Sequence, residues 1–282
     1  MREEKFLYAE KETIRFKFVK KGEFKYLSHL DLLRIISRAS VRAGLKPVYS
    51  MGFNPKPEIS FSNPTPLGVE SLAEYCDIEL YGLVGEEKFI NSMNEVLPEQ
   101  LSIIQAKIIG RNVPKLMSEI SLILYQFNIR LADIEIKSFL KMKKELPLDN
   151  KNLSKRNYNL LEISKIQETL KKNFRHWIKK NHDFYNSIHN FDFFISNNDV
   201  NDLKIALKIY GYAKIFKEKN NLIFKFNNFL NFLNDFINEY KLNLESFQKV
   251  EMYLNLGDEK GKQDNNLSDE SENKLFTPLD AL

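Results

Sequence analysis

The stretch that decides how the chain begins to fold is Thr13-Ile14-Arg15-Phe16-Lys17-Phe18-Val19. Apolar and polar residues alternate along it, and a period of two is typical of a strand that buries one face. Ser28 follows as a helix N-cap, with Asp31 three residues later, where a carboxylate supports the cap. Apolar residues then recur at helical spacing as far as Gly44, a natural stop, so we expect a helix over residues 29–43.

Prolines and glycines punctuate the next segment and leave room for two short strands, at 48–50 and 58–62. Alternation returns at 73–81, an amphipathic helix fits 86–97, and a β-branched run predicts a strand at 101–109. The order strand, helix, strand, strand, helix, strand is that of a ferredoxin-like β-α-β-β-α-β unit.

The second half of the chain again combines alternating segments with amphipathic ones, but the periodicity is less regular. Further elements are expected, namely strands at 120–131, 158–163, 203–210, 222–226 and 248–254, and helices at 134–144, around 166–177 and at 229–240. The predicted fold class is therefore α+β, with two tandem ferredoxin-like units of which the second is decorated.

Four segments follow from these elements: a flexible arm over 1–11, domains over 12–110 and 111–256, and an acidic tail over 257–282. We expect the tail to be disordered because it is polar and charged, apart from an apolar end after Lys274. This end either docks into a partner or packs on its own domain.

Composition excludes several classes of protein. With 282 residues the chain suits two domains, and its hydrophobic fraction of 43% is sufficient for packed cores. The single cysteine, Cys76, excludes a disulfide framework, a thiolate zinc cage and an iron–sulfur site. No apolar run reaches the roughly 18 residues of a membrane span and no signal peptide is visible, so we expect a cytoplasmic protein without a membrane partner. No cofactor or metal is predicted, since His176, His182 and His189 are spaced by six and seven residues and bring no thiolates.

Charge is unevenly distributed although the net charge is only +4. Residues 12–56 hold ten basic and three acidic side chains, whereas residues 57–110 hold two and nine. A second basic block, residues 137–182, holds thirteen basic and four acidic side chains. Two local basic zones indicate anion-binding surfaces, or alternatively the solvated faces of lysine-rich helices.

The first predicted helix carries three arginines at a spacing of four, Arg34, Arg38 and Arg42, which form one ridge. We call these three residues the arginine ridge. With Lys46 and Lys56 they are the candidate phosphate contacts of a nucleic acid, because guanidinium groups bind phosphate oxygens in pairs. Tyr49 and Phe53 are the candidate platforms for stacking unpaired bases. An ordinary solvated helix face is the alternative.

His29 and Asp31, at the start of this helix, are weak catalytic candidates, because a histidine kept neutral at a helix N-terminus can act as a base. Such a residue more often caps the helix or packs. Glu74 and Asp77 fall on opposite faces of a regular strand, which argues against shared acid–base chemistry.

An ordered series of motifs resembles the bacterial radical SAM-linked protein domain family, of unknown function. Its first part is Leu27-Ser28-His29-Leu30-Asp31 with Arg38-Ala39 and Arg42-Ala43-Gly44-Leu45. The later motif residues are Ser50, Gly52, Phe53, Asn54, Pro55, Pro57, Pro64, Pro66, Leu67, Gly68, Val69, Glu70, Ser71, Glu74, Tyr75 and Asp77. The likeness is specific over about residues 12–82. Since members occur alone or fused to a radical SAM enzyme, some of them near RNA-processing genes, it implies an accessory of such an enzyme that acts on RNA.

The sequence departs from the family pattern at Met51, where glutamine is usual, and at Lys56, where histidine is usual. Lys56 retains an anion contact but removes a proton shuttle. The chain also lacks the cysteine triplet of the radical SAM module, so the resemblance implies a partner enzyme in trans.

Three functions remain open at this point. The first is an RNA-binding accessory protein, and the second is a protein-interaction module that docks a radical SAM enzyme without nucleic acid. The third is a metal-independent endoribonuclease that uses His29, an analogy of fold alone.

Overall fold

A computed structural model describes residues 10–110, 113–132, 160–199, 202–214, 221–240, 242–254, 275 and 277–280. In this part of the chain the strands join in one large, mostly antiparallel sheet, accompanied by six α-helices. The mixed α+β class predicted from the sequence is thereby confirmed. Contacts divide the chain into two compact units: unit 1 comprises Met1–Leu122 and Lys249–Leu282, and unit 2 comprises Ile123–Gln248.

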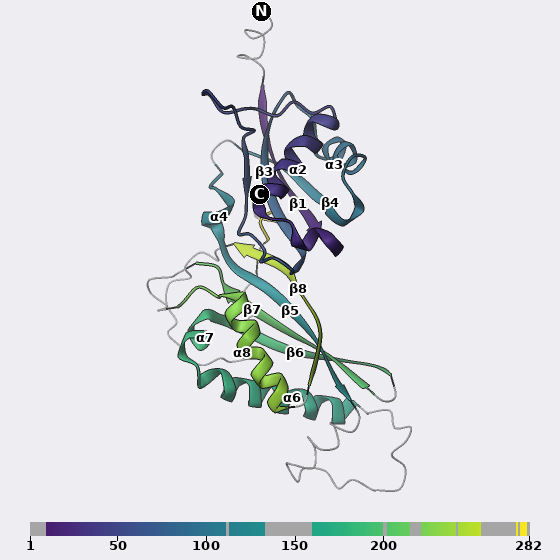
Figure 1. The fold of residues 1–282 in the computed structure, drawn as a ribbon, viewed down its shortest axis with the longest axis vertical. Coiled ribbons are helices and arrows are strands. Elements are labelled where there is room, and N and C mark those ends of the chain that lie inside the picture. The colour runs from purple at the N-terminus through teal and green to yellow at the C-terminus, as the bar shows by residue number, and fades with distance from the viewer. Residues whose placement is uncertain are drawn as a thin grey trace, which may run out of the picture. The chain divides into compact units, whose positions relative to one another are not determined.

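Unit 1 contains the first elements of the chain, among them three short helices that the sequence did not predict, namely those at 22–26, 99–101 and 116–119 (Figure 1). These elements are β1 (Lys11–Lys20), η1 (Gly22–Tyr26), α2 (His29–Arg42), β2 (Ile59–Phe61), β3 (Glu70–Tyr81), α3 (Glu86–Asn94), η2 (Glu99–Leu101), β4 (Ile103–Ile109) and α4 (Leu116–Glu119). Strand β1 pairs antiparallel with β3 and β4, and β2 pairs antiparallel with β3. The order across the sheet is thus β4-β1-β3-β2, and the end of β8 (Asn243–Leu254) also pairs with β3.

The core of unit 1 lies between this sheet and helices α2 and α3. Ile14, Phe16 and Phe18 project from one face of β1 and are fully buried. They belong to one cluster with Ile36 of α2 and Phe89 of α3. Burial of each side chain of this size contributes about 1.5–3 kcal/mol to stability. Burial of these three side chains of β1 therefore helps to hold α2 and α3 against the sheet.

Unit 2 contains β5 (Ile120–Ala132, from Ile123 on), α6 (Leu160–Lys179), α7 (His182–Ser187), β6 (Ile188–Asp199), β7 (Asp202–Tyr212), α8 (Phe226–Glu239) and the first part of β8. Its strands follow the order β8-β5-β7-β6. In both units the sheet therefore reads last strand, first strand, third strand, second strand. Aromatic rings fill the core of unit 2: the ring of Phe174 lies 5.5 Å from that of Phe193 and 5.1 Å from that of Phe236.

Several elements predicted for the second half differ from the structure. The strand predicted at 158–163 is wrong, because α6 begins at Leu160 and Ile163, Ile166 and Leu170 continue one helical spacing. The strand predicted at 222–226 is also wrong, since Phe226 is buried as the first residue of α8.

The sequence did not predict α7 or β6, and the apolar run Phe193-Phe194-Ile195 interrupts the alternation that would have indicated β6. The strand expected at 48–50 is reduced to isolated pairings of Pro47 with Leu80 and of Tyr49 with Pro57. The helix predicted at 134–144, most of the N-terminal arm and the acidic part of the tail lie outside the described residues.

Candidate nucleic-acid interface

The arginine ridge is carried by a well-capped helix. Ser28 Oγ accepts a hydrogen bond from the backbone N–H of Asp31 at 3.2 Å, as the sequence predicted. All three arginines are exposed. A guanidinium nitrogen of Arg34 lies 3.2 Å from Asp31, and Arg42 donates to the carbonyl of Val96 at 3.2 Å. Both contacts lie at the surface, where such pairs contribute little, so the ridge keeps its positive charge toward solvent.

The proline-rich loop after α2 is a short hairpin with exposed apolar side chains at its tip. Tyr49 pairs with Pro57, and Ser50 N–H donates to the carbonyl of Lys56 at 2.8 Å. The backbone N–H of Lys56 in turn donates to Ser50 Oγ at 3.0 Å. Phe53 is fully exposed at 106% and Met51 at 94%. The hairpin therefore presents an unpacked aromatic ring on a backbone that its own hydrogen bonds hold.

The second motif loop, residues 64–71, lies against η1, the segment that precedes α2. Gly68 has a φ of +81°, which favours glycine, and its N–H donates to the carbonyl of Lys25 at 3.0 Å. A Cβ at this position would lie 3.7 Å from the ring of Tyr26. Glu70 accepts a hydrogen bond from the N–H of Gly22 at 3.1 Å. The motif residues Gly68 and Glu70 thus join the loop to the segment that precedes α2.

Glu74 lies at the centre of a buried cluster that the sequence reading did not anticipate. Lys249 Nζ is 2.9 Å from Glu74 Oε1, and the Thr65 hydroxyl donates to the same carboxylate. Lys20, buried nearby, interacts electrostatically with both partners. Alternation alone assigns Glu74 to a strand face. Its two charged partners, Lys20 and Lys249, are 54 and 175 residues away in the sequence, and no local pattern indicates that they meet it.

Burial and charge act against each other in this cluster. Burial alone raises the pKa of Glu74, but Lys249, Thr65 and Lys20 outweigh it and hold the pKa below its ordinary value. Burial lowers the pKa of Lys249 and of Lys20, and Glu74 partly opposes this effect. The two lysines and Thr65 therefore favour the ionised form of Glu74, whose loss would leave the lysines buried without a counter-charge.

A second ionic network lies around Asp77. Arg15 Nε and Nη2 donate to the two carboxylate oxygens of Asp77 at 2.8 and 2.9 Å, a bidentate pair. Burial raises the pKa of Asp77, and Arg15 opposes the rise. Lys17 pairs with Glu251, which also accepts a hydrogen bond from Tyr75 Oη at 2.6 Å. Glu74 and Asp77 therefore have separate partners.

Residues 277–280, the described part of the apolar C-terminal end, pack on other residues of unit 1. Leu279 is buried, at 1% exposure, and its carbonyl accepts a hydrogen bond from Lys107 Nζ at 3.1 Å. Thr277 and Asp280 close a turn, with the Thr277 hydroxyl donating to Asp280 Oδ2 at 2.7 Å. Arg15 Nη1 also reaches the carbonyl of Pro278 at 3.5 Å. We call residues 277–280 the C-terminal turn.

The weak catalytic candidates are occupied by structural contacts. The ring of His29 packs edge-on against Phe61, with centroids 5.1 Å apart. Asp31 Oδ2 accepts from the Ser28 hydroxyl at 2.6 Å, and this bond is the main reason that the pKa of Asp31 lies below its ordinary value. Burial raises the pKa of Cys76, which is consistent with an inert thiol. Within the described ranges, no three His, Cys, Asp or Glu residues gather to hold a metal ion.

The sequence of the chain matches the model of a known protein family. Residues 13–204 match the model described as "Uncharacterized protein conserved in bacteria (DUF2344)", and this match spans more than half of the chain. The chain belongs to this family. The description does not mention radical SAM enzymes, so that linkage stays a prediction. The match covers the arginine ridge, both motif loops and Glu74, but not Lys249 or the C-terminal turn.

Other comparisons add little. No curated protein matches the chain. Among solved structures, it is similar to one described as "Crystal Structure of an Unknown Protein from Galdieria sulphuraria", at 6% identity over 86% of this chain and 99% of that one. The TM-score is 0.23, too low to support an inference about fold or function. No helix in the described part of the chain has the length and apolarity needed to cross a membrane.

Proposed function

We propose that this chain is an RNA-binding accessory protein that works with a radical SAM enzyme in RNA or ribosome modification or processing. The observation that carries the proposal is the hairpin over residues 49–57, whose Phe53 ring is fully exposed. An exposed aromatic ring on an ordered loop offers a flat apolar face at little entropic cost, and an unpaired base can stack on such a face.

The charged groups of unit 1 suit the same ligand. Lys56 lies within the hairpin, and the arginine ridge is exposed along α2. Guanidinium groups bind phosphate oxygens without regard to base sequence, whereas stacking requires unpaired bases. Together they favour single-stranded RNA or RNA loops over a regular duplex.

We further propose that the two units are tandem ferredoxin-like units. Both place their last strand beside their first, and their third between the first and the second. Sheets of this topology present a broad face opposite their helices, a surface that some RNA-binding proteins use.

A second candidate function is docking to a radical SAM enzyme without nucleic acid. The observation that favours it is a group of exposed apolar side chains around the start of α2 and the second motif loop: Tyr26 at 66%, Leu30 at 61% and Leu67 at 65%. Such side chains are typical of protein interfaces. The third function, an endoribonuclease, has less support because His29 packs against Phe61.

Fluorescence anisotropy with a fluorescein-labelled, 20-nucleotide single-stranded RNA of mixed sequence tests the first function. We expect Arg38→Glu to weaken binding about tenfold or more. The binding constant of the unmodified protein should fall by roughly 0.7 logarithmic units per phosphate contact for each tenfold rise in salt concentration. Lys88→Glu, an exposed lysine on α3, is the matched control. Equal affinity of both variants, or binding that does not depend on salt, contradicts the proposal.

A crosslinking pull-down from cells separates the first two functions. RNA and proteins are identified from the same sample, with Arg38→Glu and Leu30→Asp as the variants. Loss of RNA only with Arg38→Glu supports the RNA-binding function. Recovery of a radical SAM enzyme that depends on Leu30, with no RNA in any sample, favours the docking function.

A further inference from the structure

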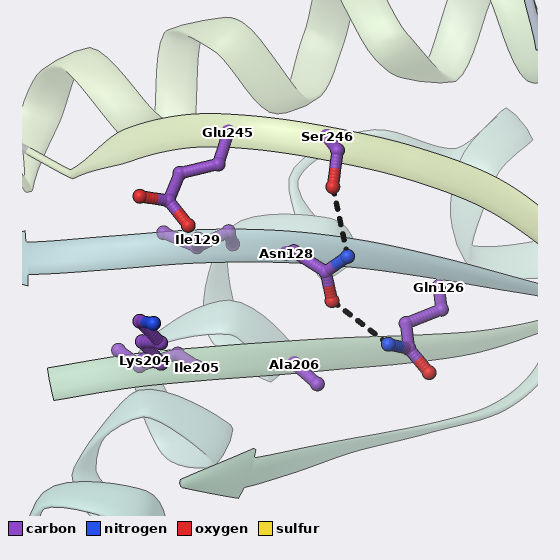
Figure 2. Close-up of a pocket in the computed structure, with 8 residues that line it drawn as sticks. All are labelled: Gln126, Asn128, Ile129, Lys204, Ile205, Ala206, Glu245 and Ser246. Atoms are coloured by element: carbon purple, nitrogen blue, oxygen red, sulfur yellow. Dashed lines mark hydrogen bonds between the residues drawn. The ribbon is translucent and has the colours of Figure 1, made fainter. Parts of the chain in front are cut away.

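Unit 2 contains a groove on the face of its sheet that α6 does not cover. Phe174 of α6 packs against Phe193, and successive residues of a strand point to opposite faces, so Phe194 lies on the other face. The groove on that face has a volume of about 340 Å³. Its lining comes from β5, β7 and β8, all within unit 2 (Figure 2).

A ladder of polar side chains, called the amide ladder below, joins two of these strands, β5 and β8. Gln126 Nε2 donates to Asn128 Oδ1 at 2.8 Å, and Asn128 Nδ2 donates to Ser246 Oγ at 2.8 Å. Figure 2 shows Asn128 between the other two side chains. An amide carries two N–H donors and one carbonyl acceptor, so the ladder uses only part of its hydrogen-bonding capacity. It therefore offers oriented donors and acceptors at little entropic cost.

On the open face, strand β7 places the small side chain of Ala206 between the cations Lys204 and Lys208. Lys204, Ala206 and Lys208 alternate with the buried residues Ile205 and Leu207, so all three share the open face. At about 3.4 Å per residue the two lysines sit roughly 14 Å apart along the strand, with the short side chain of Ala206 between them.

An aromatic ring completes the surface. Phe194 pairs with Ala206 in the β6–β7 register, and 46% of its surface is exposed. Lys208 Nζ lies 4.5 Å from the centre of this ring, a cation–π contact. The ring of Phe194 therefore lies beside Ala206. Ala206 and the side chains of the amide ladder line the same groove.

Acidic groups near this surface are already paired. Glu245, which lines the groove, lies 3.7 Å from Arg130 Nε. Asp192, next to Lys208 in the register, lies 2.7 Å from Lys171 Nζ. Together with Arg130 and Lys171, the two lysines of β7 outnumber these two carboxylates by four to two, and this excess of positive charge favours a ligand with negative charge over a neutral sugar.

From this arrangement we infer that the open sheet face of unit 2 binds an unpaired nucleobase of single-stranded RNA. The base stacks on Phe194 over Ala206, the amide ladder bonds to its polar edge, and Lys204 and Lys208 contact the flanking phosphates. Asparagine and glutamine amides match base edges in hydrogen-bond pattern. This site is distinct from the arginine ridge and hairpin of unit 1 and goes beyond the function proposed for them.

The test measures the affinity of the full chain for a fluorescein-labelled, 12-nucleotide single-stranded RNA of mixed sequence. We expect Lys204→Glu to weaken binding about tenfold and Phe194→Ala about fivefold or more, while Phe194→Tyr keeps the platform and restores most of the affinity. Lys172→Glu, an exposed lysine on α6, changes affinity less than about twofold. Thermal melts followed by circular dichroism check that the variants fold.

The outcomes separate this inference from the proposed function. If Lys204→Glu and Phe194→Ala both bind as the unmodified protein does while Arg38→Glu fails, the inference is overturned and the proposed function stands. If the unit 2 variants lose affinity and Arg38→Glu keeps it, the inference stands and the arginine ridge is not the RNA site. Absence of RNA binding by the unmodified chain, or a photo-crosslinker at position 194 that captures protein and no RNA, overturns the inference.

Discussion

The two units share an order of strands but differ in where their charged side chains lie: unit 1 buries several of them, and unit 2 keeps them at the surface among the described residues. Among the described residues, the buried charged ones all belong to unit 1: Glu12, Arg15, Lys20, Glu74, Asp77 and Lys249. The buried polar residues of unit 2 are the uncharged Ser187 and Asn221, and its core is aromatic. Unit 2 instead places its amides and lysines on an open sheet face.

This difference shows which surfaces are available for binding. In unit 1, Arg15, Lys17 and Lys107 are engaged by Asp77, Glu251 and the C-terminal turn. What unit 1 offers to a ligand is therefore the exterior of α2 and the two motif loops. In unit 2 the described residues leave Phe194 and Lys204 exposed on the sheet face, so the two proposed binding surfaces use different parts of one strand order.

The largest expected effect comes from breaking the buried ion pair of unit 1. Glu74→Ala leaves Lys249 and Lys20 buried without their carboxylate, which lowers the free energy of unfolding by about 3–5 kcal/mol. Asn128→Ala, in the exposed ladder of unit 2, lowers it by less than about 1 kcal/mol. Urea denaturation measures the free energy of unfolding of both variants. Equal losses would contradict the claim that the buried ion pair of unit 1 matters more for stability than the exposed amide ladder of unit 2.

Removing the side chain that the C-terminal turn buries has the next largest effect. Leu279→Ala should lower the free energy of unfolding by about 2–4 kcal/mol, because a fully buried leucine is lost from the sheet face of unit 1. Leu67→Ala, at a leucine 65% exposed, is the control and should change it by less than about 0.5 kcal/mol. If the two variants unfold alike, the turn does not close this face in solution.

The pH dependence of stability sharpens the comparison further. The pKa of Glu74 is lower in the folded state than its ordinary value of 4.5, so the folded protein binds fewer protons between these two values. The stability that Glu74 contributes is present above about pH 4.5 and is lost as the pH falls below it, by about 1.4 kcal/mol per unit of pKa difference.

Unfolding of the unmodified protein and of Glu74→Gln between pH 6 and pH 3 measures this contribution. Their difference in stability should shrink toward low pH, and other carboxyl groups, including Asp77, cancel in the subtraction. A difference that stays constant or grows toward pH 3 would show that Glu74 is not held ionised by the lysines.

The smallest expected effect compares the helix caps of the two units. Ser28→Ala removes the N-cap of α2 and Asn181→Ala that of α7, where Asn181 Oδ1 accepts from Phe184 N–H at 3.2 Å. Each should cost about 1 kcal/mol, with Ser60→Ala on β2 as a neutral control. Thermal melts detect the change, and a loss of stability only with Asn181→Ala would show that the start of α2 is held by packing instead.

The sequence predicted much of unit 1 because its signals are local. The alternation at 13–19 and the cap at Ser28 give β1 and α2 within one or two residues of their observed bounds. In the second half, local signals were weaker: β6 was missed, and the start of α6 was assigned to a strand. The candidate residues of the hairpin and the arginine ridge could be named from residue type and spacing, whereas the groove of unit 2 could not.

What the sequence determined by itself is the α+β class and the exposed arginines and loops of the first half, because periodicity, capping and turn chemistry act between near neighbours. Tertiary structure alone decided that Lys249 neutralises Glu74 across 175 residues, that Leu279 covers a sheet in unit 1, and that Asn128 meets Ser246. Strand pairing joins distant segments in a register that no local pattern specifies, and each of these contacts depends on that register.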